Sequence, residues 1–378
     1  MDGSTGGVGP RSQQVVLVLQ GGGALGAYQA GVFEALHEAG IEPDWVIGTS
    51  IGAINAALIA GNAPADRLPR LRAFWDRVAH DPGLENWAGM TGLPALLPRL
   101  ATLMGGVAGF FRPNPLAFLG WEVPLTPERA GYYTTAPLAD TLAGLIDPAR
   151  LRAGSPRLTV GAANFRTGEM RYFDSRDMPL GLRHVMASGA LPPAFPAVRI
   201  DGELWWDGGI LSNTPVECVF DDTPRRNSLV FAVHIWNPAG PEPETIAQVL
   251  HRQKDLQYAS RAASYIKRQQ QMHRLRHVIE ALAGQLPPEA LDDPAVRDLT
   301  AYGCRTVMHV VRLLAPGLDQ EDHAKDIDFS SAGIRARWAA GLADTRRALA
   351  VRPWEQTSDP LEGFVLHEIR HDTIPAAA

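Results

Sequence analysis

The feature that most constrains this chain is a pair of strand–turn–helix units within its first 61 residues. Residues 14–20 (QVVLVLQ) form an almost continuous apolar run, and a helical pattern follows over 24–39. Residues 44–48 (DWVIG) predict a second short strand, and 50–60 predict a helix of small residues. Because apolar runs of this kind are typical of buried parallel strands, their alternation with helices predicts an α/β fold with a mostly parallel sheet.

Predicted strands and helices continue to alternate up to residue 236, and the composition of the chain then changes. A linker rich in Pro and Gly follows, and the chain beyond it is mainly helical. We therefore expect a tail at 1–13, a catalytic domain at 14–236 and an extension of unknown role at 237–378. Further strands are predicted over 157–165, 169–175, 202–211, 229–236 and 306–314, and further helices over 182–191, 245–284 and 333–350.

Composition excludes several classes of protein. The 378 residues are 46% hydrophobic and carry a net charge of -6, so nucleic acid is not an expected partner. The two cysteines, Cys218 and Cys304, lie far apart and form no metal-ligand spacing, which predicts buried thiols in a reducing compartment. No apolar run reaches the roughly 18–20 residues of a membrane-spanning helix, and residues 1–13 lack a signal-peptide core. We expect a cytoplasmic protein that touches a membrane at most peripherally.

The second strand–helix junction carries the sequence Gly48-Thr49-Ser50-Ile51-Gly52, a G-x-S-x-G pattern. A sharp turn at this junction pushes the middle hydroxyl out of the fold, and flanking glycines let neighbouring segments approach. The pattern alone also arises by chance, and a serine here can simply cap its helix. Because a predicted strand precedes it and a helix follows, we interpret Ser50 as a nucleophile.

The first junction holds four glycines: Gly21, Gly22, Gly23 and Gly26. Such a loop lets backbone N–H groups converge on a small anion, which suits either a nucleotide phosphate or an oxyanion hole. A dinucleotide site needs an acid at the end of the second strand, whereas Asp44 opens that strand, and no Walker-type Gly-Lys-Ser/Thr follows. An oxyanion hole beside the serine is therefore preferred, with a nucleotide-binding regulatory module as the non-enzymatic alternative.

A base for Ser50 can be sought among histidines or carboxylates. His184, His234 and His309 occupy no recognisable catalytic loop, so each is interpreted as structural or surface histidine. Asp207 follows a predicted strand and precedes a tight Gly208-Gly209 turn. An Asp–Gly turn is ordinarily a surface feature, but the two tryptophans before it indicate that the strand leading to Asp207 is buried. A desolvated carboxylate can take the proton of a serine, so Asp207 is the predicted base.

These motifs, in this order, resemble the patatin-like phospholipase family over about residues 15–219. The resemblance implies a three-layer α/β/α fold and a Ser–Asp dyad that hydrolyses acyl esters through an acyl-enzyme, with no cofactor or metal. It implies that Ser50 is the nucleophile and Asp207 the proton acceptor. It also implies that the oxyanion is bound chiefly by the backbone amides of Gly22 and Gly23. Many members carry a basic residue where this chain has Leu25, so a head-group contact at that position is not expected. The matching segments are GGGALGAYQAGVFEAL (21–36), GTSIGAINAA (48–57), ASGALPPAFPAV (187–198) and the Asp-Gly-Gly turn.

Two further segments bear on the substrate. Residues 89–121 are the most apolar stretch, and they predict either a lid that lines the acyl site, with Phe110 and Phe111, or ordinary core-covering helices. The helix at 245–284 is basic and amphipathic, which predicts either a solvated face or contact with anionic lipid. The expected partner is a lipid or other acyl ester; short esters, thioesters and polyester oligomers remain the alternative substrates. The basic residues of that helix are Arg252, Lys254, Arg261, Lys267, Arg268, Arg274 and Arg276.

Overall fold

The computed structural model describes residues 13–79, 105–120, 122–318, 324–356, 359 and 361–369. A nine-stranded sheet has the order β11-β10-β9-β1-β2-β5-β8-β7, and β6 also pairs with β5. A separate short pair joins β3 (Arg112–Pro113) to β4 (Tyr133–Thr134). The strands of the large sheet are β1 (Gln14–Leu19), β2 (Trp45–Gly48), β5 (Arg157–Asn164), β6 (Met170–Asp174), β7 (Val198–Ile200), β8 (Glu203–Asp207), β9 (Ser228–His234), β10 (Met308–Leu314) and β11 (Phe364–Glu368).

Helices cover this sheet and connect its strands. Short 3-10 turns occur at η1 (Gly23–Gly26), η2 (Pro115–Leu119), η3 (Gly208–Ile210), η4 (Lys325–Ile327) and η5 (Pro353–Glu355). The α-helices are α1 (Ala27–Glu38), α2 (Ile51–Ala60), α3 (Pro64–Val78), α6 (Ala136–Leu145), α7 (Pro148–Ala153), α8 (Leu182–Ser188), α9 (Glu217–Phe220), α10 (Ile246–Ala283), α11 (Pro288–Leu291), α12 (Pro294–Thr300) and α13 (Ser331–Val351).

The central part of the sheet is parallel, as predicted. Strands β11, β10, β9, β1, β2 and β5 all run in one direction, while β6 and β8 run antiparallel to β5. The carboxyl ends of β1 and β2 meet at the same edge because Leu19 pairs with Gly48. The glycine loop after β1 and the serine turn after β2 therefore emerge side by side.

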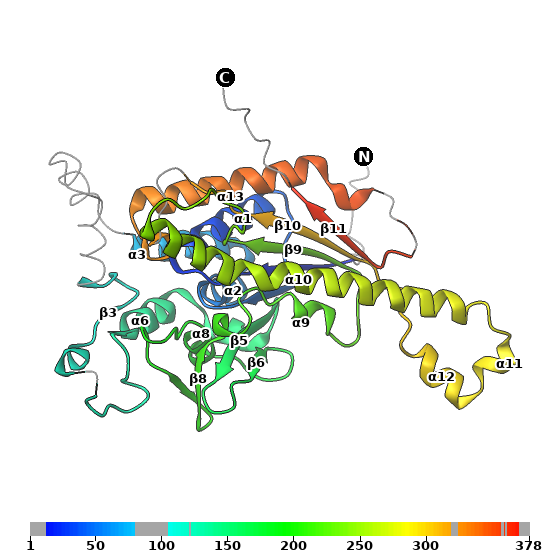
Figure 1. Ribbon diagram of the computed structural model, residues 1–378, viewed down its shortest axis with the longest axis horizontal. Coiled ribbons are helices and arrows are strands. Elements are labelled where there is room, and N and C mark those ends of the chain that lie inside the picture. The colour runs from blue at the N-terminus through cyan, green and yellow to red at the C-terminus, as the bar shows by residue number, and fades with distance from the viewer. Residues whose placement is uncertain are drawn as a thin grey trace, which may run out of the picture.

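The sheet separates two hydrophobic clusters. On β1, Val15, Leu17 and Leu19 pack into one cluster, and Val16 and Val18 pack into the other. The first cluster also contains residues of α1, α2, α3 and α13, and the second contains residues of α9, while α10 contributes Ala259 to the first and Ile266 to the second. Figure 1 shows α1 and α13 on one side of β9 and α10 passing on the other. The predicted three-layer α/β/α fold is confirmed.

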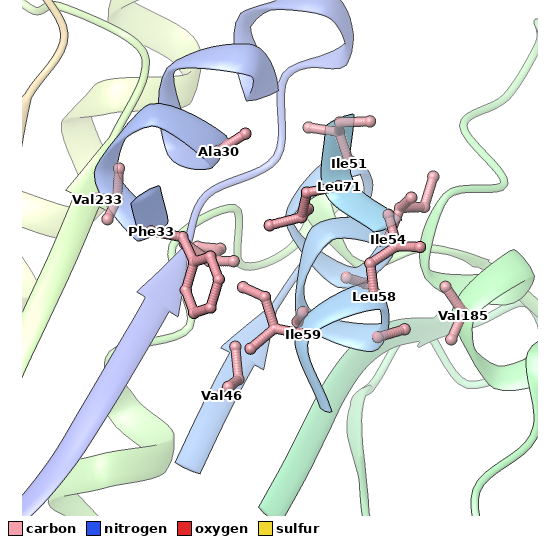
Figure 2. Close-up of a cluster of buried hydrophobic side chains, with 14 of the residues drawn as sticks. Ala30, Phe33, Val46, Ile51, Ile54, Leu58, Ile59, Leu71, Val185 and Val233 are labelled. Atoms are coloured by element: carbon pink, nitrogen blue, oxygen red, sulfur yellow. The ribbon is translucent and has the colours of Figure 1, made fainter. Parts of the chain in front are cut away.

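The helix that follows the serine turn is buried in the hydrophobic core. Every residue of α2 is buried, and Figure 2 shows its Ile51, Ile54 and Ile59 in the cluster with Phe33 of α1 and Val46 of β2. Apolar burial of this kind contributes roughly 25 cal/mol per Å². The two strand–turn–helix units thus share one packed core, which fixes the turns that carry the glycines and the serine.

The chain after residue 236 packs against the same sheet and extends it. It is mainly helical, as expected, but β10 pairs with β9 and β11 pairs with β10, so two of its strands extend the same sheet. The helix α13 packs on α1 so closely that a Cβ on Gly31 would lie 2.0 Å from the carbonyl oxygen of Trp338. Figure 1 shows α10 running beyond the sheet, with α11 and α12 at its far end. Among the described residues no helix is long and apolar enough to cross a membrane.

Candidate active site

Ser50 lies at the turn between β2 and α2 in a strained backbone conformation. Its φ of 56° and ψ of -124° fall where L-residues other than glycine rarely occur, and such strain clusters at functional sites. The two motif glycines make the turn possible. A Cβ on Gly48 would lie 2.3 Å from the carbonyl carbon of Gly52, and one on Gly52 would lie 2.2 Å from the carbonyl oxygen of Leu19.

A second serine, for which the sequence predicted no separate role, holds the backbone of the turn. The N–H of Ser50 donates to the Oγ of Ser188 at 3.1 Å, and that hydroxyl donates to the carbonyl of Gly161 at 2.6 Å. Ser188 ends α8, within the ASGALPPAFPAV segment that carried the resemblance. Its position in that segment was the only sequence feature that could have suggested a role for Ser188 at the site.

Asp207 ends β8 and is buried, with 1% of its surface exposed. The N–H of Gly209 donates to its Oδ1 at 2.7 Å, and the Ser50 side chain lies close enough to the carboxyl group to lower its pKa. Burial raises the pKa of Asp207 to about 7, against the opposing effect of Ser50 and Gly209. The adjacent Gly208 is packed so tightly that a Cβ would lie 2.5 Å from the carbonyl oxygen of Gly161. The structure thus places the predicted nucleophile and the predicted base side by side in the lining of one cavity.

The three histidines lie elsewhere, and none lines the cavity at Ser50. The ring of His184 contacts the backbone of Gly181, and His309 lies 3.0 Å from His367 across neighbouring strands. His234 is buried in β9, where burial and the nearby Arg312 lower its pKa to about 3. Asp207, by contrast, lines the same cavity as Ser50.

The glycine loop lies against the serine, and its glycines differ in what their N–H groups do. The N–H of Gly21 donates to the carbonyl of Asn213 at 3.1 Å, so it is engaged within the protein. Gly26 packs on α2, where a Cβ would lie 2.5 Å from the Cγ1 of Ile51. Nothing in the described part of the chain accepts a hydrogen bond from the N–H of Gly22 or Gly23. Of the four predicted glycines, these two can therefore donate to a ligand.

The groups that fix this loop were not predicted. The carbonyl of Gly21 accepts hydrogen bonds from Asn213 Nδ2 at 3.1 Å and from Trp236 Nε1 at 2.8 Å. Gln20 is fully buried, and its Oε1 accepts from the N–H groups of Ile235 and Trp236. A buried glutamine directly before a glycine run is a signal that the sequence did offer.

A cavity of about 190 Å3 opens between the serine and the glycine loop. Its walls are mainly apolar, with a cluster of aromatic rings and no Lys, Arg or His among the lining residues. Phe110 and Phe111 belong to that cluster and are buried, whereas residues 89–104 and 121 of the predicted lid lie outside the described residues. The aromatic residues of the lining are Phe110, Phe111, Tyr133, Phe195, Trp236, Tyr258 and Phe329.

The arrangement gives no support to nucleotide binding. Asp44, the acid nearest the required spacing, accepts a hydrogen bond from the N–H of Val15 at 2.8 Å, at the amino end of β1. The glycine loop lies at the other end of that strand. An apolar cavity without cationic side chains also disfavours phosphate.

Fold and site together define a class: a three-layer α/β protein with a strained serine turn, a buried carboxylate partner and a glycine loop facing both. A family model described as patatin-like phospholipase matches residues 17–219, more than half of the chain. This chain belongs to the patatin-like phospholipase family. A second model, described as patatin phospholipase, matches residues 256–361 in the C-terminal region.

Individual relatives match shorter parts of the chain. A lysophospholipase of Aspergillus terreus is 59% identical over 51 residues, and human patatin-like phospholipase domain-containing protein 6 is 46% identical over 61 residues. These segments cover 14% and 16% of this chain but only 3% and 4% of those proteins. An uncharacterised NTE family protein of Mycobacterium tuberculosis is 26% identical over 249 residues, 65% of this chain and 56% of that protein.

Two solved structures align with most of the chain at low sequence identity and low TM-score. VipD from Legionella pneumophila shares 18% identity with a TM-score of 0.33, covering 87% of this chain and 67% of that chain. ExoU from Pseudomonas aeruginosa, in its complex with SpcU, shares 19% identity with a TM-score of 0.30, covering 93% of this chain and 74% of that chain.

Proposed function

We propose that this protein is a serine acyl-ester hydrolase that acts on lipid esters through the Ser50–Asp207 pair. The observation that carries the proposal is the buried carboxyl group of Asp207, which lies beside a strained serine in the lining of one mainly apolar cavity. A pKa of about 7 suits a group that must both take and return a proton near neutral pH.

In this mechanism Ser50 Oγ attacks the ester carbonyl while Asp207 accepts the hydroxyl proton. The N–H groups of Gly22 and Gly23 hold the negative charge that develops on the carbonyl oxygen. Asp207 returns the proton to the departing alcohol, which leaves an acyl group on the serine. Water then attacks that acyl-enzyme with Asp207 again as base, and transfer of the proton back to Ser50 releases the carboxylic acid.

The cavity supports an acyl substrate and also suggests a second candidate. Its aromatic walls fit a hydrocarbon chain, and the relatives described above include a lysophospholipase and a patatin-like phospholipase domain-containing protein. Its volume of about 190 Å3 is below the roughly 300–1,000 Å3 of pockets that enclose drug-sized ligands. That size favours a short acyl group, so short esters, thioesters or polyester oligomers are the second candidate substrates.

A fluorophosphonate probe tests the chemistry directly. The wild-type protein should be labelled on Ser50, and Ser50→Ala should abolish both labelling and hydrolysis. Asp207→Asn should reduce turnover of every ester tested, because the amide cannot accept the proton. Hydrolysis of phospholipids, lysophospholipids, acylglycerols and p-nitrophenyl esters of graded chain length then separates lipid from short-ester substrates. Full activity in Asp207→Asn would end the dyad proposal.

We also propose that the protein meets its substrate at a lipid surface through α10. Lys267, Arg268 and Arg274 are exposed on this helix, and exposed cations are attracted to anionic lipid. Co-sedimentation with phosphatidylserine vesicles should exceed that with phosphatidylcholine vesicles and should weaken in salt. Equal binding to both vesicles would contradict this role of α10.

A further inference from the structure

The glycine loop is held in place by residues that lie beyond the 17–219 family match. Trp236 donates to the carbonyl of Gly21, and its ring packs against that of Tyr258 of α10 in a tilted arrangement, at a centroid distance of 4.9 Å. On the other side, the carbonyl of Asp326 in η4 lies against Gly23, where a Cβ would be only 2.2 Å from that oxygen. The two glycines with free N–H groups are therefore confined between Trp236 and the turn at 324–329, here called the strap.

Two crossed ion pairs fasten the strap to α10. Lys325 Nζ lies 2.7 Å from Asp255 Oδ1, and both residues are buried, with 6% and 5% of their surfaces exposed. One position along each segment, Lys254 Nζ donates to Asp326 Oδ1 at 2.8 Å. Adjacent residues of opposite charge on one segment thus meet their complements on the other, which fixes the position of the strap along the helix.

Lys325 also reaches the loop by a second route. Its Nζ lies 5.4 Å from the centroid of the Trp236 ring, within the range of a cation–π contact. The same ammonium group therefore contacts the helix that anchors the strap and the indole that holds Gly21. The strap also contributes Ile327 and Phe329 to the wall of the cavity.

We propose that the strap positions the oxyanion-binding glycines, with Lys325 and Asp255 as positioning residues for the hydrolysis; this inference rests on the proposed function. Hydrogen bonds to an oxyanion stabilise a transition state only when their donors are held in place beforehand. Because Gly22 and Gly23 have no partner of their own for these N–H groups, their position depends on Trp236 and Asp326. A C-terminal region without a catalytic motif would in this way be needed for turnover.

Lys325→Met tests the proposal in the full-length protein, and Arg157→Met is its matched control. Arg157 forms a largely buried ion pair with Asp174 at 2.7 Å, at the amino end of β5 and away from the loop. Both variants lose a buried pair, so both should lose stability. Measured well below its melting temperature, Lys325→Met should lose at least tenfold in kcat, more than any change in KM. Arg157→Met should keep kcat within twofold of wild type, and Lys325→Arg should recover most of the loss.

Hydrogen exchange of the peptide that spans residues 20–26 gives a readout independent of activity. Exchange there should be faster in Lys325→Met than in Arg157→Met. If it is not, or if kcat of Lys325→Met falls less than tenfold, the inference is overturned. Should Lys325→Met fail to fold, the half-exposed Lys254→Met should lose at least threefold in kcat, and a smaller loss overturns the inference.

The two proposals fail in different ways. If the wild-type protein neither hydrolyses esters nor reacts with a fluorophosphonate at Ser50, the proposed function fails and the catalytic role of the strap fails with it. If the wild-type protein is active and Lys325→Met matches it, the proposed function stands and the strap alone is refuted.

Discussion

Replacing the proposed base should make the protein more stable while it removes turnover. Asp207→Asn keeps the size of the side chain and an oxygen that can accept from the N–H of Gly209, as Asp207 Oδ1 does at 2.7 Å. What the substitution removes is the need to bury a charge. Burial raises the pKa of Asp207 from 3.8 to about 7, so the ionised carboxylate costs the folded protein free energy.

The magnitude follows from linkage between proton binding and folding. The difference between the ordinary and the folded pKa of Asp207 corresponds to about 4 kcal/mol at ~1.4 kcal/mol per pKa unit. The folded pKa is the higher of the two, so the cost is absent below pH 4, grows as pH rises through 4 to 7, and is complete above 7. We therefore expect Asp207→Asn to gain up to about 4 kcal/mol at pH 8. The gain should disappear near pH 4.

Urea unfolding at pH 4, 6 and 8 measures this dependence. A gain of about 4 kcal/mol moves the midpoint by roughly 1 M or more at m values of about 1–3 kcal/mol per M. Asp174→Asn is the control, because it should change the free energy of unfolding in the opposite direction. Burial alone would raise the pKa of Asp174, but hydrogen bonds from Arg157 and Thr159 outweigh burial and lower it. Its charged form therefore stabilises the fold above its ordinary pKa, and Asp174→Asn should destabilise the protein at pH 8.

The reasoning about Asp207 is refuted by one clear result. If Asp207→Asn unfolds at the same urea concentration as wild type at pH 8, or at a lower one, the folded protein carries no desolvation cost at this carboxyl group. Asp207 would then be an ordinary ionised aspartate with no raised basicity, and the case for it as base would rest on its position beside Ser50 alone.

Three further predictions concern rate, packing and specificity. The kcat/KM of ester hydrolysis should fall about tenfold per pH unit below about pH 7, because Asp207 must be ionised to accept the proton; a flat profile between pH 5 and 7 would exclude it as base. Gly26→Ala should cost about 1–3 kcal/mol of stability in urea, because the new methyl group would lie 2.5 Å from Ile51 Cγ1. Its control, Gly144→Ala in α6, meets nothing within 4 Å and should gain up to about 1 kcal/mol. Phe329→Leu should lengthen the cavity and shift the preferred p-nitrophenyl ester to longer acyl chains; an unchanged chain-length profile would show that the strap does not line the acyl site.

Local motifs allowed much of this site to be predicted from the sequence. A strand, a turn and a helix that follow one another specify their own geometry, so Ser50 and the glycine loop were placed at the right ends of β1 and β2 before any tertiary contact was known. The close approach of Gly48 to Gly52 is likewise a contact between residues that are near in the sequence. Parallel pairing then brings two such turns together, because both strands end at one edge.

Contacts between distant parts of the chain could not be predicted in this way. Asp326 meets Gly23 across about 300 residues, and Lys325 meets Asp255 between segments that no periodicity connects. The same is true of Trp236, whose role depends on the N–H of its ring reaching Gly21. A lysine beside an aspartate is common on any surface, so the charges that fasten the strap give no signal until the fold brings them together.

The burial of Asp207 depends on a departure from the parallel pattern. A carboxylate at the end of a parallel strand would emerge at the open edge of the sheet, where water keeps its pKa low. Strand β8 instead enters from that edge and runs antiparallel to β5, so that Asp207 pairs with Ala162, inside the end of β5 at Asn164. Gly48 pairs with Val160, which places the serine two residues later near the same level. The antiparallel strand therefore sets the carboxyl group opposite the serine and below the solvent-exposed edge, and this depth raises its pKa.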